Sequence, residues 1–160
     1  ETALALANRL GWQADVELAT GNSAGAIALR SEEAALIDRL LRTDPENAEF
    51  RERRLWPDVG IAVALVRQNR NAEAIRILKR CLAAYNQMAT SRSDDVTITE
   101  ARIRITAIAA NAARDSGSNE AAQFAARARL LYQQLRRTHT AAQMARFDAM
   151  MIELEQGGRL

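Results

Sequence analysis

Residues that carry metal, disulfide or nucleophilic chemistry are scarce in this chain of 160 residues. It has one cysteine (Cys81) and one histidine (His139). That pair can supply neither a disulfide framework nor a zinc site built from clustered Cys and His ligands. No run of about 18 apolar residues occurs, which excludes a typical transmembrane helix. No basic segment leads into an apolar stretch with a cleavage site, so we expect no signal peptide.

Glycine, proline and aromatic residues are also few: seven Gly, two Pro and 4% aromatics. Alanine (33 residues) and arginine (21 residues) dominate instead, and lysine occurs once, at Lys79. Alanine and arginine are good helix formers. Apolar residues make up 48% of the chain, which is enough for a core. The composition therefore predicts one all-α domain and excludes all-β, collagenous and disordered chains.

The net charge of +2 is unevenly distributed. Residues 1–50 carry 4 basic and 9 acidic groups (−5), whereas residues 51–140 carry 16 basic and 8 acidic groups (+8). The middle of the chain could attract an acidic partner, although a solvated Arg/Glu surface explains the same pattern. The chain begins at Glu1, so we expect it to be part of a larger protein. A lone cysteine fits a reducing compartment, so we expect a cytoplasmic location.

Helix signals divide the chain into about seven helices. Expected starts are Asp44-Pro45, Thr97-x-x-Glu100, Thr140-x-x-Gln143, Asn71 and Ser118, and expected turns include Gly21 and Gly117. Pro57 predicts a kink or break in the third helix. The last helix carries an apolar stripe of Met144, Phe147, Met151 and Leu154. The predicted helices are 2–19, 23–42, 45–69, 72–90, 97–115, 119–137 and 141–156.

A similar segment recurs about every 47 residues. Residues 20–27 (TGNSAGAI) align with 68–75 (QNRNAEAI) at an offset of 48, and these align with 115–122 (DSGSNEAA) at an offset of 47. A small residue recurs at Ala26, Ala74 and Ala121, and Cys81 aligns with Ala128. Small residues let two helices approach closely, so the pattern predicts stacked helical hairpins over 2–42, 45–90 and 97–137, followed by the helix 141–156.

The chain here resembles the tetratricopeptide repeats, a family of helical hairpins. Residues 44–50 (DPENAEF) look like its repeat boundary and residues 68–75 like its inter-helix turn. The period is longer than the family's 34 residues, as in variants attached to bacterial multidomain signalling proteins. The resemblance implies a right-handed superhelix whose groove binds a peptide or protein. It further implies a non-enzymatic scaffold or regulatory role. The alternative is a ligand-sensing effector domain of a transcription regulator.

In such a fold the groove would draw on residues 51–69 and 98–115. Arg67 and Arg114 occupy equivalent repeat positions, so stacking would bring them near one another to grip a carboxylate or phosphate. Further arginines could extend this basic surface or simply pair with acids: Arg51, Arg53, Arg54, Arg102 and Arg104.

The remaining candidates have simpler explanations. His139 is expected on the surface or capping a helix, and Cys81 in the core, so we expect no enzyme, no cofactor and no metal site. Nucleic acid is a weaker alternative partner, because the scattered aromatics mostly fit core faces. The stripe on the last helix should cap the superhelix; its alternative use is self-association.

Overall fold

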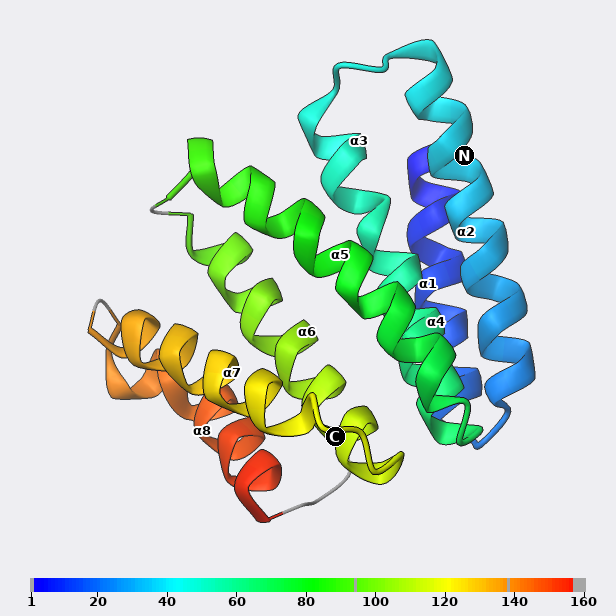
Figure 1. Ribbon diagram of the computed structural model, residues 1–160. Coiled ribbons are helices and arrows are strands. Elements are labelled where there is room, and N and C mark those ends of the chain that lie inside the picture. The colour runs from blue at the N-terminus through cyan, green and yellow to red at the C-terminus, as the bar shows by residue number, and fades with distance from the viewer. Residues whose placement is uncertain (1, 94, 138, 157–160) are drawn as a thin grey trace. The chain divides into compact units, whose positions relative to one another are not determined.

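The described chain is α-helical, as predicted. The structure is a computed structural model that describes residues 2–93, 95–137 and 139–156. At residues 142, 146, 153 and 156 it describes the backbone alone. No strand occurs in these ranges. Figure 1 shows the helices in chain order. They are α1 (Ala3–Ala19), α2 (Ser23–Thr43), α3 (Ala48–Arg53), α4 (Leu55–Arg67), α5 (Asn71–Ser91), α6 (Val96–Asp115), α7 (Ala121–Arg136) and α8 (Ala141–Gln156).

The third predicted helix is interrupted, which confirms the break expected from Pro57. The interruption lies at Arg54, so Pro57 falls in the first turn of α4. Backbone N–H groups have no intrahelical partner there, and proline costs nothing by lacking one. The predicted start at Asp44-Pro45 is wrong. Asp44 ends α2 instead, and Asn47 caps α3 by accepting a hydrogen bond from the Phe50 amide at 3.1 Å.

Two other predicted helix starts are displaced, and one is confirmed. Helix α6 is capped by Asp95, whose Oδ1 accepts from the Ile98 amide at 3.2 Å, so it starts before the predicted box at Thr97. Helix α7 begins at Ala121 rather than after Ser118. The box at Thr140 forms as predicted, because the Thr140 amide donates to Gln143 Oε1 at 2.9 Å. At α6 and α8 a side chain that accepts an orphan amide thus sets the start, whereas α7 has no side-chain cap.

The same left-handed turn recurs every 48 residues. Gly21, Asn69 and Gly117 have φ angles of 89°, 60° and 67°, and each follows the end of a helix. In each turn the next residue's amide reaches back five residues, as in Asn22 to Glu17 (2.8 Å), Arg70 to Leu65 (2.9 Å) and Ser118 to Ala113 (2.8 Å). This is the Schellman arrangement, which satisfies the last carbonyls of a helix. The three turns are therefore structurally equivalent, and the first two agree with the predicted offset of 48. The second predicted offset, 47, is wrong by one residue, because it aligns Asn69 with Ser116 rather than with Gly117.

The chain forms two compact units, Glu1–Ile77 (the N-terminal unit) and Leu78–Leu160 (the C-terminal unit), divided within α5. In the N-terminal unit α1 packs along α2, and α2 packs along α4. Its core is formed by Ala7, Leu10, Leu36 and Ile37. The single repeat domain and its right-handed superhelix stay predictions.

In the C-terminal unit α6 packs along α7, and α8 contacts both. The stripe of Met144, Phe147, Met151 and Leu154 is buried against residues of α6 and α7. The stripe therefore belongs to the core of its own unit. Because these side chains are buried, they do not offer an exposed surface for self-association. Cys81 is buried as predicted. Lys79 of α5 pairs with Glu120 at 2.5 Å and lies 6.0 Å from the Phe124 ring centroid.

An ion cluster around the largely buried Arg30 and Glu33 links α1 and α2, and a glycine of α4 lies against it. Arg30 of α2 pairs with Glu33 at 2.7 Å and with Asp15 of α1 at 2.5 Å. The arginine lies against two glycines, Gly11 of α1 and Gly60 of α4. A Cβ at Gly60 would stand 2.5 Å from Arg30 Nε, and one at Gly11 would stand 2.9 Å from Arg30 Nη1. Both glycines therefore make room for the guanidinium.

Gly60→Ala should lower the free energy of unfolding by about 1–3 kcal/mol, the usual cost of overpacking. Elsewhere in a helix the same change stabilises by about 0.5–1 kcal/mol, so the sign is diagnostic. Urea denaturation of the single variant and of Gly60→Ala combined with Arg30→Ala measures the effect. The alanine should cost little once Arg30 is removed; an equal cost in both backgrounds would contradict the clash.

Burial raises the pKa of Glu33, and this outweighs the opposing effect of its hydrogen bond and ion pair with Arg30. The folded protein therefore holds this proton more tightly than the unfolded chain. The stability contributed by Glu33 should grow as the pH falls from about 7 through the raised pKa toward about 4.5.

Glu33→Gln cannot titrate, so its free energy of unfolding relative to wild type should fall over that pH interval. Urea denaturation at several pH values measures the difference. Glu32→Gln is the matched control, because it removes the same charge from an exposed position in the same helix. The prediction would be contradicted if the free energy of unfolding of Glu33→Gln relative to wild type stayed constant or rose on acidification.

Candidate interaction surface

An open groove runs along α1 on the N-terminal unit. Its volume is about 830 Å³. Trp12 and Val16 lie in it with 75% and 62% of their surfaces exposed. Two exposed apolar side chains beside a groove make this face the candidate interaction site. The lining residues are Ala5, Asn8, Arg9, Trp12, Gln13, Val16, Glu17 and Leu29.

Helix α1 carries this groove because it has two side-chain stripes. Thr2 caps the helix by accepting from the Ala5 amide at 3.2 Å. One stripe, with Ala7, Leu10, Gly11 and Ala14, is buried. The groove-lining residues 5, 8, 9, 12, 13 and 16 follow the same helical spacing on another face. The apolar residues that remain after the core is filled therefore face solvent.

Arg53 extends the groove toward a second exposed tryptophan. Its Nη1 donates to Asn8 Oδ1, a groove-lining residue of α1, at 2.8 Å. Its guanidinium carbon lies 5.1 Å from the ring centroid of Trp56, which is 45% exposed. A cation stacked on an aromatic face is attracted to it, so Arg53 holds the two sides together. We call Asn8, Trp12, Val16, Arg53 and Trp56 the Trp12–Trp56 surface.

The prediction that the aromatic residues mostly lie in the core is wrong for both tryptophans. Tyr85 and Phe147 are buried, but Trp12 and Trp56 are exposed. Tryptophan and arginine are the side chains most enriched at energetic centres of protein interfaces. The stripe that contains Trp12 and Val16 was the sequence signal that could have located this surface.

The arginines predicted at equivalent repeat positions contact backbone carbonyls. Arg67 Nη1 donates to Leu18 O at 2.9 Å, near the end of α1. Arg114 Nη2 donates to Leu154 O at 2.7 Å, near the end of α8. A cation is favourable at the negative end of a helix dipole, so each arginine stabilises a helix end. They belong to different units, and their predicted joint grip on an anion stays a prediction.

Arg51 and Arg54 pair with carboxylates. Arg51 contacts Glu46 at 2.7 Å, and Arg54 contacts Asp38 at 2.7 Å and Asp58 at 2.8 Å. Burial by itself would lower the pKa of Arg54, but its hydrogen bonds and ion pairs with Asp58 and Asp38 outweigh that effect and raise the pKa. These contacts fit the solvated-surface alternative for this part of the basic segment.

Arg102 donates to a side-chain amide rather than to a carboxylate. Its Nε donates to Asn86 Oδ1 at 2.8 Å. Burial lowers the pKa of Arg102, and the nearby charge of Arg127 lowers it further. Arg104, on the same helix, is exposed. Arg127 had no role in the sequence interpretation, because the proximity of residues 102 and 127 depends on the packing of α6 on α7.

Other sequence candidates are explained locally. His139 Nδ1 lies 3.1 Å from Leu135 O at the end of α7, which fits the expected helix-capping role. Within the described ranges, no three His, Cys, Asp or Glu side chains gather as a metal site would require. In those same ranges no helix has both the length and the apolarity to traverse a lipid bilayer.

Comparisons with known proteins add no family: no family model, curated protein or solved structure matches the chain.

The two tryptophans should report different environments in fluorescence. Trp56→Phe leaves Trp12 as the single emitter, and Trp12→Phe leaves Trp56, which is shielded by Arg53. We expect Trp12 to emit at longer wavelength and to be quenched more steeply by acrylamide. Steady-state spectra and quenching titrations measure both, with matching far-UV circular dichroism as the control. Equal quenching of the two would contradict the exposure of Trp12.

Proposed function

We propose that this chain is a non-enzymatic interaction module that binds a peptide or protein segment on the Trp12–Trp56 surface. The observation that carries the proposal is the exposure of Trp12 and Val16 within the α1 groove. The proposal extends to a scaffold or regulatory role within a larger bacterial signalling protein in the cytoplasm, which the tetratricopeptide resemblance alone supports.

Energetics favour a binding role for this surface. Burying a tryptophan removes about 200 Å² from water, worth about 5 kcal/mol at about 25 cal/mol per Å² before the costs of association. Folding does not use this contribution at Trp12, which stays 75% exposed. A partner that covered the ring would gain it. Arg53 and Asn8 would orient that partner through polar contacts at the edge of the apolar area.

The position of the groove agrees with the resemblance. In tetratricopeptide-like proteins the first helix of each hairpin lines the peptide-binding groove, and α1 is the first helix of the first predicted hairpin. The turn that recurs at Gly21, Asn69 and Gly117 also supports a repeated hairpin. The partner would be an amphipathic segment with apolar side chains for Trp12 and Val16.

The ligand-sensing alternative is less well supported. A sensor of small molecules needs an enclosed pocket between helices that buries most of its ligand. The groove on α1 is open at Trp12 and Val16. We therefore place the transcription-regulator hypothesis second.

A displayed library of random peptides, selected on the immobilised chain, tests the proposal. Selected peptides should bind the Trp12→Ala variant at least about tenfold more weakly than wild type, a loss of about 1.4 kcal/mol. In the Trp56→Phe background, binding should shift the emission of Trp12 to shorter wavelength.

Leu130→Ala is the matched control, because Leu130 of α7 is an exposed apolar residue of the other unit. It should leave affinity unchanged. Failure to enrich any peptide, or enrichment of peptides that bind Trp12→Ala as tightly as wild type, would overturn the assignment of this surface.

A further inference from the structure

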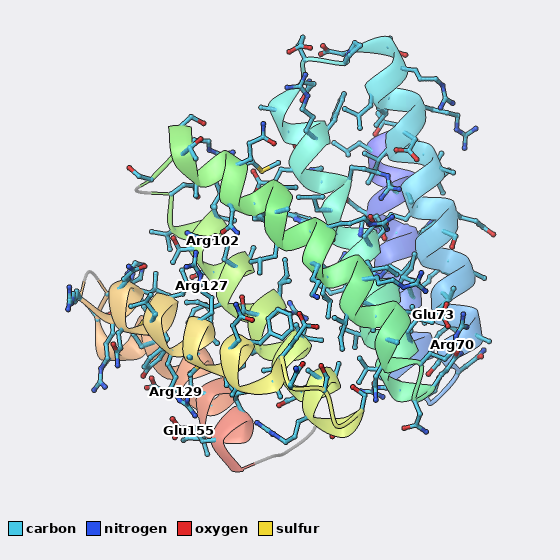
Figure 2. All side chains as sticks on the ribbon, in the orientation of Figure 1. Arg70, Glu73, Arg102, Arg127, Arg129 and Glu155 are labelled. Carbon is cyan, nitrogen blue, oxygen red and sulfur yellow. The ribbon has the colours of Figure 1, made fainter. Side chains whose placement is uncertain are left out.

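Arg102 and Arg127 lie near one another in the C-terminal unit (Figure 2), and no carboxylate of the described residues pairs with either. Figure 2 shows Arg102 of α6 and Arg127 of α7 close together where these helices pack. Among the described residues, neither arginine forms an ion pair with Asp or Glu. By contrast, seven of the other arginines do so: Arg30, Arg51, Arg53, Arg54, Arg70, Arg92 and Arg129.

The packing places charge where it is costly. Arg102 is only partly exposed, and arginine stays protonated in proteins. A half-buried cation next to a second cation loses hydration and gains repulsion. The lowered pKa of Arg102, caused by burial and then by Arg127, has the same origin. An anion between the two groups would relieve both effects.

The hydrogen bonding of Arg102 leaves its outer edge available. Its Nε donates to Asn86 Oδ1 at 2.8 Å, which fixes the plane of the guanidinium. Two N–H bonds, one on each Nη atom, lie on the edge of the guanidinium away from Nε and form the fork that binds two oxygens of an oxyanion. Arg127, on the exposed face of α7, supplies a second fork.

We propose that Arg102 and Arg127, with Asn86 orienting Arg102, form a binding site for the dianion of a phosphate monoester. Charge balance selects this class: a phosphate monoester carries close to −2 above its second pKa of about 6, which matches two guanidinium groups. A carboxylate would neutralise one of them. The site lies in the C-terminal unit, so it does not depend on the proposed function of the α1 groove.

The probe for the first experiment is inorganic phosphate, titrated near pH 8 at constant ionic strength set with NaCl. The arginine Nε–H signals of the ¹⁵N-labelled chain report binding directly, because the Nε–H of Arg102 is held by Asn86. The wild type should show a saturable shift of that signal. Affinity should fall at least about tenfold in Arg127→Gln, and it should fall near pH 5.5, where the dianion is scarce.

Arg104→Gln is the matched control, since it removes the same charge from an exposed position of α6. It should bind phosphate like wild type. Shifts that grow linearly with salt, or that are equal in the Arg104→Gln and Arg127→Gln variants, would mean general screening and would overturn the site. Stronger binding of acetate than of phosphate would overturn the charge-balance argument.

A thermal melt without phosphate gives a second, independent readout. Arg127→Gln removes the repulsion on Arg102, so its Tm should rise relative to wild type. A lower Tm would mean that Arg127 already has a stabilising partner, and the proposal would fail. Titrations with a capped phosphoserine peptide and with glycerol phosphate then distinguish two sources of the monoester. Tighter binding of the peptide indicates a phosphorylated protein segment, and tighter binding of glycerol phosphate indicates a small metabolite.

Discussion

The arrangement of the N-terminal unit depends on one guanidinium group. Arg30 reaches Asp15 on α1 and Glu33 on its own helix, and Gly60 of α4 allows α4 to lie against it. A buried ion cluster contributes little net stability, since dehydrating its charges is costly. Removing Arg30 is nevertheless costly, because Glu33 is then left buried without this partner. Because Gly11 of α1 and Gly60 of α4 lie directly against Arg30, this side chain limits how closely the three helices approach there.

The recurring turns serve a complementary purpose. Each reverses the chain with a residue at positive φ and uses the last carbonyls of the preceding helix. Glycine occupies that position at residues 21 and 117. Asparagine occupies it at residue 69, where it is the non-glycine side chain best tolerated at positive φ. Equivalent turns therefore recur at equal spacing along the chain, although the helices that they join differ in length.

Local features of the fold could be predicted from the sequence, and features that depend on packing could not. The helical class, the break near Pro57, the left-handed turns and the Thr140 box follow from short-range preferences of named residues. Helix starts at Asp44 and Thr97 failed because neighbouring side chains, Asn47 and Asp95, reach the orphan amides instead.

The candidate sites show the same division. Trp12 was expected to fit a core face, but it is exposed, because its helix offers more apolar residues than the α1–α2 contact can cover. Arg67 and Arg114 looked like anion ligands, but their carbonyl partners lie 49 and 40 residues away in sequence. The pairing of Arg102 with Arg127 required the contact between α6 and α7. Such juxtapositions are decided by tertiary structure, which one sequence without relatives does not reveal.

The strong preference for arginine has a chemical consequence at Lys79. It is the one lysine in the sequence, so it is the single side-chain amine that an acylating reagent or an acetyltransferase could modify. That ammonium holds Glu120 and faces the ring of Phe124. Acetylation would remove its positive charge and with it both contacts. Acetylation of this one residue would thus weaken the contact between α5 and α7, while every guanidinium group kept its charge.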